Sequence, residues 1–173
     1  MHVRPTTDED APALQALVEI VARERRYLGS TDGFTVAQTR DYLSHVRASN
    51  GVALVLVDAE RLVGWIDIVR GPFEGLTHYG RLGMGLAPDA RGRGLGQRLL
   101  DDALAEGFGK GLTRIELEVF ASNARAIALY RQAGLVEEGC RRRARIIDGI
   151  EDDILLFGLL RDEWHGKVKL PNS

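Results

Sequence analysis

Apolar residues along this chain follow two spacings, one typical of β-strands and the other of α-helices. Unbroken or alternating apolar runs predict strands, and the run at residues 52–57 is almost wholly β-branched or apolar, as in a buried strand. The predicted strands cover residues 3–4, 52–57, 62–69, 79–87, 113–120, a sixth that opens at Leu135, and a last one from about 152 to 160.

Apolar residues three or four positions apart predict four helices between these strands. Thr7 is an N-cap candidate for the first helix, since three acidic residues follow it in the first turn. The predicted helices cover residues 7–26, a segment from Thr35 through Val46, residues 95–108, and residues 123–134. Because helices connect successive strands in the second half, the order predicts an α/β fold with a mixed sheet of six to seven strands and helices on both faces.

Glycines mark two special places in the predicted strands. Asp148-Gly149, between apolar residues, is a strong signal for a tight hairpin turn. Gly83 and Gly85 lie inside the predicted strand 79–87, where glycine weakens pairing. We therefore expect a bulge there, or a place where another molecule approaches the backbone.

Composition narrows the class of protein. The 173 residues, 45% of them hydrophobic, are enough for one domain, which we expect at 1–160 with a polar tail at 161–173. A formal net charge of −2 gives no electrostatic footprint for nucleic acid or an anionic membrane. With one cysteine, no signal segment and no apolar run of roughly 18 residues, we expect a soluble, cytoplasmic protein. No cluster has metal-ligand spacing, so no metal is expected.

The segment Arg91-Gly92-Arg93-Gly94-Leu95-Gly96 lies between a predicted strand and a predicted helix. Backbone N–H groups at such a turn point at one place and attract an anion, while glycines allow close approach. The segment therefore predicts a pyrophosphate site. Gln97-Arg98 does not supply the Gly-Lys-Ser/Thr of a kinase-type loop. A dinucleotide fingerprint is incomplete, although Glu116 lies at the distance of a ribose acceptor.

The order Arg91-x-x-Gly94-x-Gly96 resembles the acyl-CoA pyrophosphate loop of the GNAT superfamily of N-acetyltransferases. A second motif, Leu117-x-Val119-x-x-x-Asn123-x-x-Ala126-x-x-Leu129-Tyr130-x-x-x-Gly134-Leu135, resembles the family's strand–Asn–helix–Tyr signature. The spacing of the two motifs and the order of elements also fit. Within the family, the chain is similar to bacterial amino-acid and phosphinothricin-type members.

The resemblance implies a splayed pair of central strands that holds acetyl-CoA as co-substrate. Backbone amides from Gly92 to Gln97 (through Arg93, Gly94, Leu95 and Gly96), aided by Arg91 and Arg93, would hold the pyrophosphate. Main-chain groups at Met84, Gly85 and Leu86 would pair with the pantetheine arm, and the Leu86 N–H would polarise the thioester carbonyl. Asn123 would bond the cofactor arm or fix the start of its helix.

The resemblance also implies catalytic roles. Tyr130 would protonate the departing CoA thiolate, and Glu118 would accept the proton of the amine. The Glu118 position matches the base of the ribosomal-protein N-terminal alanine acetyltransferases, whose Leu-Glu-Val-x-x-Ser-Asn run resembles residues 117–123 here. Glu116 shares its strand face and would repel it. His78 is the alternative base, because histidine is a common proton acceptor near neutral pH.

The acceptor is the least determined part of the reaction. Asp67 and Trp65 could line its pocket or could serve the core and the sheet edge. The arginine run at 141–145 is expected to form a charged hairpin face, balanced by nearby acidic residues. We expect a small-molecule primary amine, with protein N-terminal acetylation and a non-catalytic acyl-CoA-binding module as alternatives. The final hairpin is a candidate surface for a homodimer.

Overall fold

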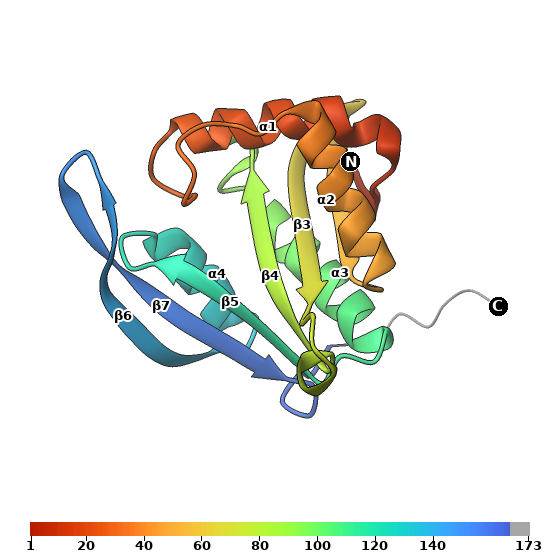
Figure 1. The fold of residues 1–173 in the computed structure, drawn as a ribbon, viewed down its shortest axis with the longest axis vertical. Coiled ribbons are helices and arrows are strands. Elements are labelled where there is room, and N and C mark those ends of the chain that lie inside the picture. The colour runs from red at the N-terminus through yellow and green to blue at the C-terminus, as the bar shows by residue number, and fades with distance from the viewer. Residues whose placement is uncertain (167–173) are drawn as a thin grey trace.

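The computed structural model describes residues 1–166, which form one seven-stranded sheet flanked by helices (Figure 1). The strand order is β1-β2-β3-β4-β5-β7-β6, with parallel and antiparallel pairs, as the sequence predicts. The elements are β1 His2–Pro5, α1 Ala11–Arg23, α2 Val36–Ala48, β2 Val52–Asp58, β3 Arg61–Arg70, β4 Tyr79–Leu86, α3 Leu95–Gly109, β5 Arg114–Phe120, α4 Ala124–Gln132, β6 Val136–Ile147 and β7 Ile150–Leu160.

Helices cover both faces of the sheet. Helices α1 and α2 lie on the near face in Figure 1, while α3 and α4 lie behind β3, β4 and β5. The main core forms against α3, where a Cβ at Gly107 would lie 3.1 Å from Ile68 and from Ile115. Phe108 beside it is fully buried. The apolar stripe expected at residues 95–108 thus faces the sheet.

The sheet splits in its middle, between β4 and β5. These two strands run parallel and pair at only three positions, from Tyr79 opposite Arg114 to Arg81 opposite Glu116. Beyond Arg81 they diverge, and Figure 1 shows β4 leaning towards β3 while β5 stays with β7. The splayed pair implied by the family resemblance is therefore present.

Of the two alternatives predicted for Gly83 and Gly85, the bulge is wrong. The antiparallel pairing of β3 with β4 runs without a shift from Gly64 opposite Leu86 to Arg70 opposite Gly80. The glycines instead make room for side chains of β3. A Cβ at Gly85 would lie 2.1 Å from the Trp65 ring, and one at Gly83 would lie 3.5 Å from an oxygen of Asp67.

The hairpin signal at Asp148-Gly149 is confirmed. Both residues have positive φ, 54° and 74°, which is the backbone of a type I′ turn between β6 and β7. The tip of the hairpin contacts the segment just after α1, since Arg25 donates two hydrogen bonds of 2.8 and 2.7 Å to Asp148. The long terminal hairpin thus stands across the split from β4 (Figure 1).

After β7 the chain returns to the back of the molecule. Trp164 packs on Phe108 of α3, with ring centroids 5.2 Å apart, so the start of the predicted polar tail belongs to the domain. The remainder of that tail, residues 167–173, lies outside the described residues. Among the described helices, none is both long and apolar enough to cross a membrane.

Candidate active site

The predicted pyrophosphate loop joins β4 to α3, and its residues 92–94 are exposed to solvent. Gly92 and Gly94 have φ of 74° and 75°, values that favour glycine, and no atom lies within 4 Å of a Cβ built on either. Gly94 is the N-cap of α3 and has no side chain to accept the first N–H groups of the helix. The N–H groups of Leu95, Gly96 and Gln97 therefore belong to an uncapped first turn, which fits an anion.

The two arginines of this loop have different surroundings. Arg91 is mostly buried, and its guanidinium donates to both carboxylate oxygens of Glu24 at 2.7 and 2.5 Å and to the carbonyl of Leu86. It also lies over the ring of Tyr27, 4.6 Å from the centroid. Arg93 is half exposed, with its nearest acidic partner, Asp58, at 3.9 Å. Arg93 is thus free to reach a phosphate, whereas Arg91 holds the end of β4 to α1.

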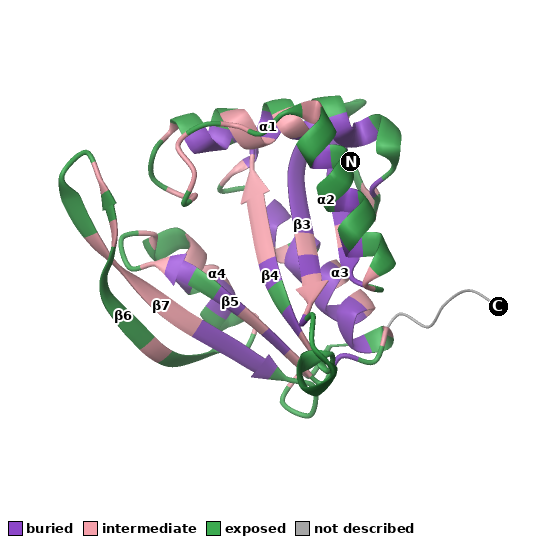
Figure 2. Ribbon diagram, in the orientation of Figure 1, coloured by how far each residue is buried: buried purple, intermediate pink, exposed green. Residues whose placement is uncertain are grey.

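The end of β4 presents its backbone towards the split. Met84, Gly85 and Leu86 are half buried, and Figure 2 shows this part of β4 as intermediate beside the buried β3. Ala87 donates its N–H to Val63 on β3, and successive residues of a strand point their backbone groups to alternate sides. The N–H of Leu86 therefore points away from β3, on the same side as its carbonyl, which Arg91 holds.

Helix α4 carries the two remaining motif residues. Asn123 is the N-cap, and its side-chain oxygen accepts from the N–H of Ala126 at 3.2 Å. This contact fixes the start of the helix, one of the two roles expected of Asn123. Tyr130 is buried near Phe157, and burial raises the pKa of its hydroxyl to about 12.

Glu118 and Glu116 both lie on β5, and each carboxylate has arginine partners. One carboxylate oxygen of Glu118 forms ion pairs with two arginines, Arg81 and Arg141, each at 2.9 Å. Glu116 instead pairs with Arg114 at 3.2 Å. Each carboxylate is thus paired with arginine, which offsets the expected repulsion. Arg114 is a neighbour of Glu116 on β5, but Arg81 of β4 and Arg141 of β6 are distant from Glu118 in the sequence, so local spacing does not reveal them.

The alternative base, His78, lies at the closed end of the split. It immediately precedes β4, and its carbonyl accepts the N–H of Thr113 just before β5. Gly83, where the split is open, lies five residues further along, about 17 Å in an extended strand. His78 is therefore remote from the place that a thioester would reach.

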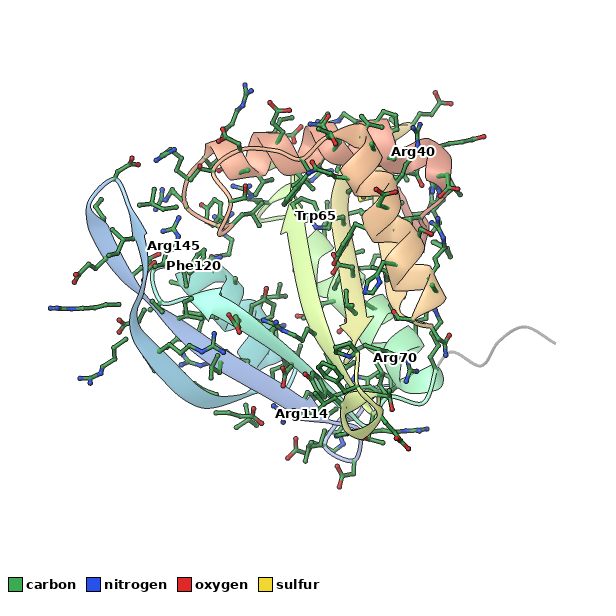
Figure 3. The ribbon with its side chains drawn as sticks, in the orientation of Figure 1. Arg40, Trp65, Arg70, Arg114, Phe120 and Arg145 are labelled. Carbon is green, nitrogen blue, oxygen red and sulfur yellow. The ribbon has the colours of Figure 1, made fainter. Side chains whose placement is uncertain are left out.

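Trp65 and Asp67 of β3 line a cavity of about 560 Å³ beneath α1 and α2. Figure 3 shows Trp65 beside the upper part of β4, with Phe120 and Arg145 across the split. Tyr42 of α2 donates its hydroxyl to Asp67 at 2.6 Å. Sequence reasoning missed Tyr42, because its distance from Asp67 along the chain hides the contact, and no local pattern identifies it.

The arginine run of β6 forms the predicted charged face only in part, because the side chain of Arg145 is 11% exposed. Arg141 pairs with Glu118 and Arg143 with Glu151, while Arg145 lies 4.3 Å from the centroid of Phe120. Within residues 1–166, no group of three or more His, Cys, Asp or Glu side chains is placed to hold a metal ion.

Comparison with known families agrees with this geometry. The model of the acetyltransferase (GNAT) family matches residues 14–135, which include the loop, the split strands and Tyr130. The chain therefore belongs to the acetyltransferase (GNAT) family.

Two curated relatives differ in their acceptors. The ribosomal protein bS18-alanine N-acetyltransferase of Escherichia coli is 43% identical over 70 residues, which are 40% of this chain and 47% of that protein. The match thus spans less than half of that relative. The spermidine N(1)-acetyltransferase of Vibrio cholerae is 26% identical over 125 residues, 71% of each chain.

Solved structures share the whole fold. The phosphinothricin acetyltransferase of Sinorhizobium meliloti, a GNAT member solved in complex with AcCoA, superposes with a TM-score of 0.88. The superposition covers 99% of this chain and 93% of the other at 16% identity. This likeness shows that the two chains share one fold.

Proposed function

We propose that this chain transfers an acetyl group from acetyl-CoA directly to a primary amine of a small molecule, in a ternary complex. One observation carries the proposal: an uncapped, glycine-lined helix start lies beside a strand whose backbone is open towards a split in the sheet. The first feature fits a pyrophosphate and the second fits an extended pantetheine arm. Membership of the acetyltransferase family supports both assignments.

The coenzyme would lie along the split. Backbone N–H groups from Gly92 to Gln97 would bind the pyrophosphate, with the half-exposed Arg93 as an added cation. Met84 and Leu86, whose backbone groups point away from β3, would pair with the pantetheine arm, whereas those of Gly85 point towards Trp65 of β3. The Leu86 N–H would stabilise negative charge on the thioester oxygen. Arg91 would act indirectly, because it holds the Leu86 carbonyl and so orients that N–H. The amide N–H₂ of Asn123 would remain for the arm.

The transfer requires two proton movements. The ammonium of the acceptor first loses a proton to a carboxylate on the near face of the sheet, for which Glu118 is the candidate from sequence. The nitrogen lone pair then forms the C–N bond, and the C–S bond breaks. Tyr130 would give its proton to the sulfur while it receives the second amine proton. No free tyrosinate, which burial disfavours, has to form.

Tyr130→Phe tests the proton donor. We expect kcat to fall 10-fold or more, the scale of general acid catalysis, with an unchanged affinity for CoA. Thiol release from acetyl-CoA over a panel of amines gives the rate, and calorimetry gives the affinity. An unchanged kcat would remove Tyr130 from the mechanism. Binding of CoA without thiol release for any acceptor would instead support a non-catalytic acyl-CoA-binding module.

Protein N-terminal acetylation is the second candidate function. It is favoured by the 43% identity to the ribosomal protein bS18-alanine N-acetyltransferase and by Glu118 in the matching run. Competition between a peptide with an N-terminal alanine and small amines decides between the two. The small-molecule proposal requires that the amine be the better substrate, and preference for the peptide would overturn it.

A further inference from the structure

The cavity beneath α1 and α2 has an apolar wall that carries a single acidic side chain. Its wall is mostly apolar, with Leu14 and Val18 from α1, Phe34 from the following loop and Trp65 from β3. Among the described residues that line it, Asp67 alone carries a charge, and no Arg, Lys or His of this part of the chain reaches the wall. A ligand that matches this wall is apolar and carries one positive charge.

The carboxylate of Asp67 lines this cavity and lies close to β4, the strand that borders the split. Asp67 pairs with Gly83, which is two residues beyond the last β4 residue that pairs with β5, Arg81. A Cβ at Gly83 would lie 3.5 Å from Oδ1 of Asp67, so no side chain separates the carboxylate from the backbone of β4 there. Asp67 therefore lies over Gly83, the residue that directly precedes Met84, where the proposed function begins the pantetheine site.

We propose that this cavity binds the acceptor as an apolar primary amine without an acidic group, and that Asp67 binds its ammonium and accepts its proton. The inference rests on the proposed function and narrows its substrate class. A free amino acid would bring a carboxylate into a wall with no cation, beside a carboxylate of like charge. An amine or an amide of the same shape avoids this cost.

The protons balance in this scheme. The ammonium gives one proton to Asp67, which returns it to solvent, and the freed nitrogen attacks the thioester carbon. The C–S bond breaks as the second amine proton passes, through Tyr130, to the sulfur. Glu118 then serves as a positioning residue, because its carboxylate joins Arg81 of β4 to Arg141 of β6.

The surroundings of Asp67 suit a base at neutral pH. Burial raises the pKa of Asp67 to about 6, and the hydrogen bond from Tyr42 opposes that rise. From β4 the nearest charged group is Arg81, which is paired with Glu118, and α1 and β2 contribute only uncharged residues to the cavity wall. The charged, proton-accepting form therefore increases as pH rises through about 6, and kcat/KM should rise with it.

Three acceptors with the same ring test the substrate class: 2-phenylethylamine, phenylalanine amide and phenylalanine. We expect kcat/KM for the first two to exceed that for phenylalanine at least tenfold.

Asp67→Asn should lower kcat/KM about 100-fold and abolish the rise near pH 6. Tyr42→Phe should move that rise to higher pH, because it removes a hydrogen bond that stabilises the charged carboxylate. Asp41→Asn, an exposed carboxylate on the same helix, is the control and should match the wild type.

Equal or better use of phenylalanine would overturn the inference, as would a pH profile that survives Asp67→Asn but not Glu118→Gln. Either result leaves acetyl transfer itself intact. If the wild type binds CoA but acetylates no amine, the proposed function fails instead. Calorimetry of 2-phenylethylamine with the protein–CoA complex then tests the cavity alone. Binding that Asp67→Asn abolishes supports the site, and binding that the substitution leaves unchanged overturns it.

Discussion

Arg91 and Arg93 are two residues apart, yet the fold gives them different partners. Both match the phosphate-binding role that the sequence suggests. In the structure, Arg91 makes two hydrogen bonds with Glu24 and holds a carbonyl of β4, while Arg93 stays half exposed. The sequence could not distinguish them, because Glu24 is 67 positions from Arg91 and no local spacing signals the pair.

Alanine substitutions at these two positions should separate stability from coenzyme binding. Arg91→Ala should lower the free energy of unfolding by about 2–3 kcal/mol, because it leaves Glu24 without its cation in a largely buried place. Arg93→Ala should leave the melting temperature unchanged and weaken CoA binding roughly 3- to 10-fold. Thermal unfolding and calorimetry measure the two effects, and an Arg91→Ala protein as stable as the wild type would contradict the assignment.

Some residues of the candidate site could be predicted because their roles are local. Gly92 and Gly94 adopt the left-handed backbone that only glycine favours, and Asn123 caps the helix that follows it. Tyr42 and the charge partners of Glu118 could not be predicted. Their contacts depend on how separate helices and strands pack, which sequence spacing does not encode.

At the scale of the element, β4 shows the limit of pattern reasoning. Two glycines in a strand predict either a bulge or a close approach, and the sequence cannot choose between them. The regular pairing with β3 excludes the bulge. The close approach comes from within the chain, since Trp65 and Asp67 lie over Gly85 and Gly83.

Gly85→Ala and Gly83→Ala should therefore differ in their effect on stability. A Cβ at Gly85 would overlap the Trp65 ring at 2.1 Å, so we expect a loss of about 1–3 kcal/mol in the free energy of unfolding. A Cβ at Gly83 would make an ordinary contact of 3.5 Å with Asp67 and should cost little. Denaturant unfolding of both variants gives the comparison, and equal losses would contradict the placement of Trp65.

At the scale of the whole molecule, element order and strand patterning predict a mixed α/β sheet. The hairpin at Asp148-Gly149 and the helix after the glycine loop also follow from local signals. The split between β4 and β5 does not follow from local signals, since neither strand contains a residue that prevents pairing beyond Arg81. It was expected only from the family resemblance, and the fold as a whole produces it.

The proposed function depends on a pyrophosphate bound at the start of α3. Calorimetric titration with CoA and, separately, with pantetheine tests this, because pantetheine has the same arm and thiol but lacks the pyrophosphate and the 3′-phosphoadenosine that the pyrophosphate carries. We predict saturable binding of one CoA per chain and at least 100-fold weaker binding of pantetheine, about 2.7 kcal/mol. Equal affinity for the two ligands, or no heat with CoA, would contradict the assignment of the loop.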